Sequence, residues 1–214
     1  MTVADVGCGH GDYTMRLAAS AAHVIGVDQD PVAISLARNL ASERQVSNVD
    51  FIETPLNAEI SSPPLRAVSG RSSVDLFVSR RGPTLSKWLH WAFSVSRPGA
   101  VALGIHPTGR AGAVPSWNDE LPDRLRIQKD EIFNHEQVLQ WVTSALTETP
   151  ARLHSTWWLD VPEVVDSADE LHARLTGDRS AQGPDFLRLQ SLIDHQGGSV
   201  ELRRCRLVWK VSLP

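Results

Sequence analysis

Apolar and polar residues follow two different rhythms along the first half of the chain. Short apolar runs predict buried strands at 2–7, 24–28, 49–53, 74–79 and 100–105. Between these runs, apolar residues recur every three or four positions and predict helices at 11–21, 31–44 and 83–94. Strands that alternate with helices in this way are typical of a parallel sheet with helices on both faces.

The pattern changes after residue 106. The segment 106–129 is rich in Gly, Pro and charged residues and is too long for an ordinary connection, so we expect it to be functional or mobile. Further along, the periodicity predicts helices at 134–146, 167–175 and 184–195, and strands at 151–159 and 199–213. Asn134 is a candidate N-cap, and Ser167 with Glu170 is a candidate capping pair.

Composition limits the class of protein. Of the 214 residues, 42% are hydrophobic and 21% are charged, which suits one soluble domain with a full core. The formal net charge of -4 argues against a large polyanionic partner such as a nucleic acid, although it does not exclude a local basic groove. No apolar run reaches the roughly 18 residues of a membrane span, and no signal peptide is visible.

The two cysteines lie far apart in sequence, at Cys8 and Cys205. They imply neither a disulfide framework nor a zinc cluster. We therefore expect no metal site, and a reducing cytoplasmic location.

A glycine-rich turn is the first candidate for chemistry. Gly7, Gly9 and Gly11 follow the first apolar run, and Asp5 precedes them. Glycine allows a sharp turn and lets a ligand lie against the backbone. A dinucleotide-binding turn would place its third glycine at position 12, where this chain has Asp12, whose charge would repel a pyrophosphate. The alternative is a tight strand-to-helix turn that binds no ligand.

A second acidic element follows at the expected distance. The apolar run at 24–28 ends in Asp28, which lies 17 residues after Gly11. A carboxylate at the tip of the second strand can accept both ribose hydroxyls of a bound nucleoside. The neighbouring Asp30-Pro31 is a good helix start, so capping is an alternative role for an acid here.

These two elements resemble those of the class I S-adenosylmethionine-dependent methyltransferases. The pattern D-x-G-x-G-x-G over residues 5–11 is similar to their motif I, 75–79 to their fourth-strand motif, and 97–100 to the turn before their fifth strand. The resemblance covers roughly residues 2–106. It implies S-adenosylmethionine as cofactor, held by a set of eight residues: Asp5, Gly7, Cys8, Gly9, Gly11, Asp28, Gln29 and Ser79.

The resemblance also implies the architecture. We expect one α/β domain over 1–214 with a doubly wound, mostly parallel seven-stranded sheet, helices on both faces and an antiparallel edge strand. Residues 1–106 would form the cofactor-binding half, and 107–214 the substrate-side half with insertions at about 106–130 and 160–198. The family's acidic residue after strand three aligns poorly, which leaves Glu53 as a candidate for holding the adenine. The helix that usually precedes strand one is missing, which raises the prospect of a truncated start.

Two arginines, Arg80 and Arg81, follow the fourth strand beside the expected position of the cofactor's sulfonium. Two cations there are unfavourable unless an anion lies between them and the sulfonium, so one hypothesis is that they bind a carboxylate or phosphate of the substrate. The alternative is a surface pair, or a salt-bridged pair that partners Asp75 or Asp28.

His106, just past the fifth strand, is the candidate catalytic base, and a loop or capping role is its alternative. The Asn/Asp-Pro-Pro-aromatic element of many amino-group and nucleic-acid methyltransferases is absent, which favours a small-molecule acceptor. The leading hypothesis is therefore a methyltransferase enzyme. The alternative is an S-adenosylmethionine-binding module or subunit with weak or no catalysis, and a nicotinamide-dependent oxidoreductase is disfavoured. The oligomeric state is not predicted.

Overall fold

The structure, a computed structural model, describes residues 1–55, 74–80, 83–107, 115–127, 135–176 and 183–214. Its first elements are β1 (Thr2–Val6), α1 (Asp12–Ala18), β2 (His23–Asp28), α2 (Pro31–Glu43), β3 (Val49–Glu53), β4 (Val74–Arg80), η1 (Leu85–Lys87), α4 (Leu89–Val95) and β5 (Ser96–Pro107). They are followed by η2 (Ser116–Glu120), η3 (Asp123–Leu125), α5 (His135–Leu146), β6 (Arg152–Val165), α6 (Ala168–Thr176), α7 (Gly183–His195) and β7 (Val200–Ser212).

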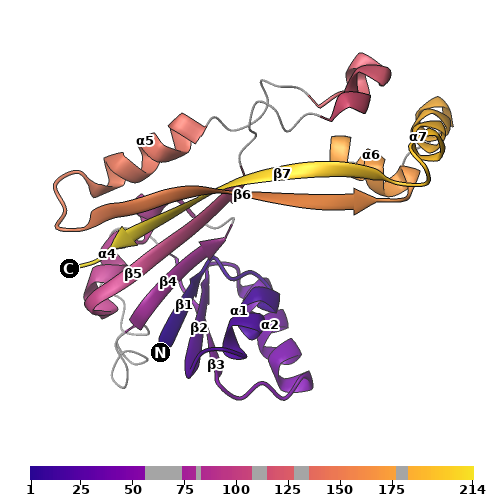
Figure 1. Cartoon of the computed structure of the whole chain (residues 1–214). Helices are drawn as coiled ribbons and strands as arrows, with labels where there is room; N and C mark the ends of the chain where they lie inside the picture. The colour runs from indigo at the N-terminus through magenta and orange to yellow at the C-terminus, as the bar shows by residue number, and fades with distance from the viewer. Residues whose placement is uncertain (56–73, 81–82, 108–114, 128–134, 177–182) are drawn as a thin grey trace. The chain divides into compact units, whose positions relative to one another are not determined.

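The strands form the predicted seven-stranded sheet, in the order β3-β2-β1-β4-β5-β7-β6 (Figure 1). The pairs β1–β2, β1–β4, β2–β3 and β4–β5 are all parallel. The last two strands run in opposite directions, so the hairpin β6–β7 supplies the antiparallel member (Figure 1). The predicted fold class, a mostly parallel α/β sheet with an antiparallel strand, is confirmed.

Helices cover both faces of this sheet, as two neighbouring residues of β4 show. Val78 packs in a cluster with Val3, Ala18 and Leu17, and therefore faces α1. Phe77, the residue before it, contacts the rings of Trp88 and Trp91 beside and within α4. Because successive side chains of a strand point to opposite faces, α1 and α4 lie on opposite sides of the sheet.

Two predicted boundaries in this half are wrong. The turn Arg97-Pro98-Gly99 lies inside β5 rather than before it, because β5 begins at Ser96 and the β4–β5 register shifts between Val74 and Leu76. Gly99 has φ +78°, a backbone conformation that glycine adopts readily, so this irregularity is built into the strand. The predicted helix 83–94 opens with the 3₁₀ turn η1 and becomes α-helical only at Leu89.

The later elements agree with the sequence in type. Helix α6 has the predicted capping contact, in which the Glu170 backbone N–H donates to the Ser167 hydroxyl at 3.2 Å. Helix α5 buries Val138 and Val142 as expected, but Trp141, placed on the same face by the sequence, is 38% exposed. The Asn134 cap lies outside the described residues.

The chain groups into two compact units. The first comprises Met1–His106, Glu136–Trp157 and Leu207–Pro214, and the second comprises Pro107–His135 and Trp158–Arg206. The two insertions expected at about 106–130 and 160–198 thus fall largely within one unit. That all 214 residues act as one domain stays a prediction.

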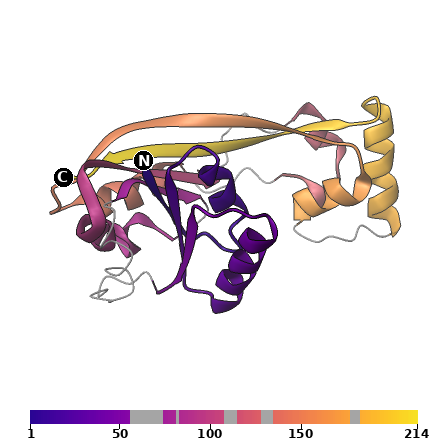
Figure 2. The same cartoon turned by 90° about the horizontal axis from the view of Figure 1, so that it is seen from below.

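The second unit has its own hydrophobic core. Side chains from η2 and η3, including Trp117 and Leu125, pack with Leu171 of α6 and Leu189 of α7, and all four are almost fully buried. These are side chains of two segments that are far apart in sequence. Figure 2 shows α6, α7 and the 3₁₀ turns from below. Among the described residues, no helix is long and apolar enough to cross a membrane.

Candidate functional site

The glycine turn between β1 and α1 is held by backbone bonds to β2. The N–H groups of Gly7 and Cys8 both donate to the carbonyl oxygen of Val27, at 2.8 and 3.1 Å. Gly7 and Gly9 have φ values of +76° and +54°, in the left-handed region that favours glycine. A Cβ at Gly9 would meet no atom within 4 Å, so the space beside this backbone is open. A ligand can therefore approach the turn at Gly9.

Gly11 serves a different purpose in the same turn. Its φ is +83°, and a Cβ there would lie 2.7 Å from the ring of Phe51 and 3.0 Å from Ala37. Gly26 of β2 would clash with the same ring, at 2.7 Å. Phe51 of β3 thus fills the space that two glycines leave, and it fixes the start of α1 against the sheet.

Asp28 joins the tip of β2 directly to the glycine turn. Its Oδ2 accepts a hydrogen bond from the Gly9 N–H at 2.8 Å, and its Oδ1 accepts one from the Asp30 N–H at 3.0 Å. A carboxylate oxygen can accept two hydrogen bonds, so each retains acceptor capacity. Helix capping is done separately by Asp30, whose Oδ1 accepts from the Val32 N–H at 2.9 Å. Asp28 therefore remains available to bind ligand hydroxyls.

Two neighbours of Asp28 are exposed at the same edge. Gln29 follows it in the chain and is exposed. Glu53, the candidate for holding the adenine, is paired with Asp28 in the β2–β3 register and is also exposed. The structure places both side chains where the second and third strands end.

Asp5 lies beneath the turn and is 2% exposed. The Thr14 hydroxyl of α1 donates to its Oδ2 at 2.6 Å. Burial raises the pKa of Asp5 to about 6, although the Thr14 hydrogen bond and the Arg80 charge act to lower it, and the Asp28 charge adds to the rise. Ionising the buried Asp5 carboxyl at neutral pH therefore costs free energy, and a cation nearby would lower that cost.

The Cys8 thiol is partly buried and lies 3.6 Å from the Gly9 carbonyl oxygen. Burial, with the charges of Asp5 and Asp28, raises its pKa well above the usual range. The thiol stays protonated and is no nucleophile. The Cys8 side chain packs against the hydrophobic cluster that includes Met15 and Phe51.

Ser79 is fully buried near the end of β4. Its hydroxyl lies 3.5 Å from the carbonyl oxygen of Pro83, which also accepts a hydrogen bond from Trp88 Nε1 at 3.3 Å. In this structure Ser79 supports the segment that follows β4. A contact between Ser79 and the cofactor stays a prediction.

Arg80 ends β4 and its side chain is exposed. Its guanidinium carbon lies 4.5 Å from the centroid of the Tyr13 ring, at the start of α1. Arg81 lies outside the described residues.

His106 lies at the carboxyl end of β5, one residue past Ile105, which pairs with Arg80. Its ring stacks on Trp209 of β7, with centroids 6.1 Å apart and planes 20° apart. Burial lowers the pKa of His106 below its usual value, so the imidazole is neutral at pH 7 and can accept a proton. In the described part of the chain, no hydrogen bond or ion pair joins His106 to the glycine turn.

Sequence reasoning missed Tyr13 and Thr14, which bring the elements of the site together. Thr14 binds Asp5 from nine residues away, and Tyr13 of α1 contacts Arg80 of β4. Neither contact leaves a local pattern, because both depend on how α1 lies across the sheet. The only cue is that both residues directly follow the glycine turn.

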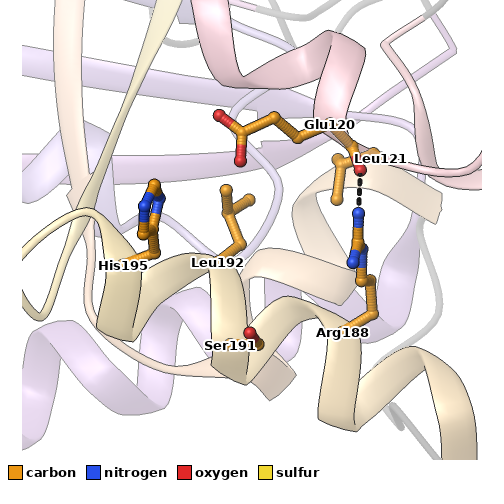
Figure 3. A pocket seen from close by; sticks show the side chains of 6 residues that line it. All are labelled: Glu120, Leu121, Arg188, Ser191, Leu192 and His195. Carbon is orange, nitrogen blue, oxygen red and sulfur yellow. Dashed lines mark hydrogen bonds between the residues drawn. The ribbon is translucent and has the colours of Figure 1, made fainter.

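A separate hollow of about 240 Å³ lies in the second unit, lined by Glu120, Leu121, Arg188, Ser191, Leu192 and His195 (Figure 3). Arg188 donates to the Glu120 carbonyl oxygen at 2.7 Å beside it. No motif from the sequence contributes a residue to this hollow. Among the described residues, no group of three or more His, Cys, Asp or Glu side chains could hold a metal ion.

Comparison with sequences of known proteins gives one extensive match and several short ones. A family model described as a methyltransferase domain matches residues 1–169. The 23S rRNA (uracil(1939)-C(5))-methyltransferase RlmD of Shewanella woodyi is 40% identical over 62 residues, 29% of this chain and 14% of that protein. Its namesake in Salmonella typhimurium is 35% identical over 82 residues, 38% of this chain and 19% of that protein. The chain thus spans less than a fifth of the length of these curated relatives.

Solved structures match along the whole chain. Precorrin-6y C5,15-methyltransferase from Geobacter metallireducens has a TM-score of 0.56 and 8% identity, over 100% of this chain and 80% of that chain. Precorrin 8w decarboxylase from Methanobacterium thermoautotrophicum has a TM-score of 0.55 and 15% identity, over 100% of this chain and 81% of that chain. At such identities these matches show the fold alone.

Proposed function

The chain belongs to a family of methyltransferase domains, and on this premise we propose that it transfers a methyl group from S-adenosylmethionine to a small-molecule acceptor. The observation that carries the proposal is the hydrogen-bonded contact between the glycine turn and the end of β2. The Gly9 N–H donates to Asp28, and the space beside Gly9 is open. An adenosyl ligand needs such an arrangement, with bare backbone on one side and a carboxylate for its ribose on the other.

The residues at this edge fit the parts of S-adenosylmethionine. The remaining acceptor capacity of Asp28 suits two ribose hydroxyls, because hydrogen bonds to a carboxylate are strong. The charge of Asp5 suits the cationic methionine end, which would offset the cost of ionising a buried carboxyl. Asp5 is too buried to offer much contact surface, so we assign it an effect through its charge.

When bound, S-adenosylmethionine supplies a methyl group attached to a cationic sulfur. The protein's task is then to align the acceptor and, for some acceptors, to remove a proton. We assign the second task to His106, whose neutral imidazole is held against Trp209. Stacking on Trp209 restricts the plane of the imidazole ring.

A small acceptor is favoured over RNA, although the RlmD relatives are named for an rRNA substrate. Those matches cover only 29% of this chain and 14% of the Shewanella woodyi protein. The net charge of -4 is opposite in sign to the positive charge that binding an RNA phosphate backbone needs.

Thermal stabilisation tests the cofactor proposal. S-adenosylmethionine and S-adenosylhomocysteine should raise the melting temperature in a concentration-dependent way, because a ligand that binds only the native state stabilises it by RT ln(1 + [L]/Kd). NAD should not, because Asp12, whose side chain is 46% exposed at the start of α1, occupies the position of the third glycine of a dinucleotide-binding turn and would repel a pyrophosphate. Stabilisation by NAD alone would contradict the proposal.

Methyl transfer is tested separately, with radiolabelled S-adenosylmethionine and a panel of small acceptors. Labelled product that forms only when an acceptor is present supports the proposed methyltransferase activity. His106→Gln should lower kcat while leaving the affinity for S-adenosylhomocysteine unchanged. Tight binding without turnover across the panel would favour a binding module or subunit instead.

A further inference from the structure

Arg80 forms no ion pair with any acid among the described residues, although its charge acts to lower the pKa of Asp5. The two acids that could have paired with it are engaged elsewhere. Asp75 accepts from the Thr2 N–H at 2.7 Å and pairs with Arg97 at 3.2 Å, and Asp28 accepts from Gly9 and Asp30. Within the described part of the chain, neither Asp75 nor Asp28 forms the salt bridge with Arg80 that the alternative expects.

The ring of Tyr13 holds Arg80 in place instead. A guanidinium 4.5 Å from a ring centroid is within the range of a cation–π contact. This contact uses the flat face of the guanidinium, whereas its N–H groups project from the edges. The contact favours one orientation of the side chain, and its N–H groups form no hydrogen bond with another described residue, so they can donate to a ligand.

The strand register places Arg80 at the cofactor edge. β1 pairs with β4 up to Asp5 and Val78, and Arg80 lies two residues further along β4. The glycine turn begins two residues after Asp5. The segments that follow β1 and β4 therefore leave the sheet side by side at the same edge. The Arg80 charge also acts on Asp5, which places the guanidinium within electrostatic range of the turn.

From this geometry we propose that Arg80, braced on Tyr13, is a subsite for an oxyanion, a carboxylate or phosphate, next to the cofactor. The inference rests on the proposed function, since a cationic sulfonium beside Arg80 is what makes an intervening anion favourable. Two sources can supply the oxyanion. One is the carboxylate of the cofactor's methionine end, and the other is an acidic group of the acceptor.

The first arm of the test asks about the cofactor's carboxylate. Calorimetry compares S-adenosylhomocysteine with S-adenosyl-3-thiopropylamine, which keeps the ammonium and lacks the carboxylate, on the wild type and Arg80→Met. If the cofactor supplies the anion, Arg80→Met should weaken S-adenosylhomocysteine roughly ten- to hundredfold and leave the amine unchanged, because a charge-assisted bond is lost.

The second arm asks about the acceptor's anion. Inorganic phosphate is titrated against the complex with S-adenosylmethionine, which carries the sulfonium, at constant ionic strength, and the melting temperature is followed. If the acceptor supplies the anion, phosphate should stabilise the wild type and not Arg80→Met, while both bind S-adenosylmethionine equally. The same phosphate titration is repeated without the adenosyl ligand, so that the methyltransferase function and the Arg80 subsite are tested separately. If the protein binds no adenosyl ligand, the proposed function is wrong. Stabilisation of the wild type by phosphate, compared with Arg80→Met, then tests the subsite by itself.

Three variants serve as controls. Arg16→Met removes an exposed cation from the same helix as Tyr13 and should behave as the wild type in both arms. Tyr13→Phe keeps the ring and should keep binding, whereas Tyr13→Leu should weaken it about two- to fivefold through the lost cation–π contact. Arg80→Met that matches the wild type in both arms would overturn the subsite.

Discussion

At the scale of single residues, the site depends on a buried carboxyl that is costly to ionise. Asp5 has a pKa of about 6 in the folded chain, against an ordinary value near 3.8. The folded state therefore binds the proton more tightly than the unfolded state does. Its contribution to stability is present in acid and is lost as pH rises from about 4 through about 6.

Asp5→Asn should consequently stabilise the chain at pH 7.5, by up to about 3 kcal/mol, since one pKa unit corresponds to about 1.4 kcal/mol. An asparagine carbonyl can still accept the Thr14 hydroxyl, so the packing is kept. The same variant should bind S-adenosylhomocysteine more weakly, because the charge that suits its ammonium is gone. Denaturant melts and calorimetry on the same samples check both effects. A less stable variant with unchanged affinity would show that Asp5 is structural only.

The pH dependence of binding gives an independent check on Asp5. Below about pH 6 the carboxyl of the free protein is protonated, so the affinity for S-adenosylhomocysteine should fall by up to about tenfold per pH unit. Asp5→Asn should show no such fall. Calorimetric titrations between pH 5 and 8 measure it, and a flat profile for the wild type would contradict this role.

At the scale of elements, the three glycines of one turn have separable tasks. Gly9→Ala places a Cβ in open space and costs only backbone strain, about 1–2 kcal/mol. Gly11→Ala has the same strain and also drives a Cβ into Phe51, so it should cost clearly more stability. Gly9→Ala should nevertheless lose more ligand affinity per unit of lost stability. Equal effects of the two variants on melting temperature would refute this division.

A glycine in β5 has a packing role of the same kind. A Cβ at Gly104 would lie 1.9 Å from Trp209, which is fully buried, so Gly104→Ala should destabilise the chain by about 3 kcal/mol or more. Adding Trp209→Phe should recover part of the loss, because the smaller ring makes room for the methyl group. Additive losses in a double-mutant cycle would show that the two residues do not interact.

The elements themselves were largely predictable from the sequence. Burial on both faces makes β1 and β2 mostly apolar, and the Asp30-Pro31 start of α2 has a local capping chemistry. The boundaries of β5 and α4 were predicted less well. Pro98 and Gly99 look like a turn in sequence, yet the strand accommodates them as an irregularity in its register.

At the scale of the whole molecule, the candidate site was only partly predictable. The glycine spacing and Asp28 predicted an edge of the sheet where the structure does bring these residues together, because β1 and β2 are neighbouring strands. The Thr14–Asp5 bond and the Tyr13–Arg80 contact could not be read from sequence, since each joins separate elements. Likewise, the second unit assembles from two distant insertions, and no local pattern reveals that Trp117 packs with Leu189.

The central claim is that this edge of the sheet binds an adenosyl ligand through Asp28. Calorimetric titration of S-adenosylhomocysteine into the wild type, Asp28→Ala and the neighbouring Asp30→Ala tests it most directly. The account predicts one site per chain, a roughly tenfold or greater loss of affinity for Asp28→Ala, and near wild-type affinity for Asp30→Ala, which only caps α2. No binding to the wild type, or equal affinity for all three proteins, would contradict it.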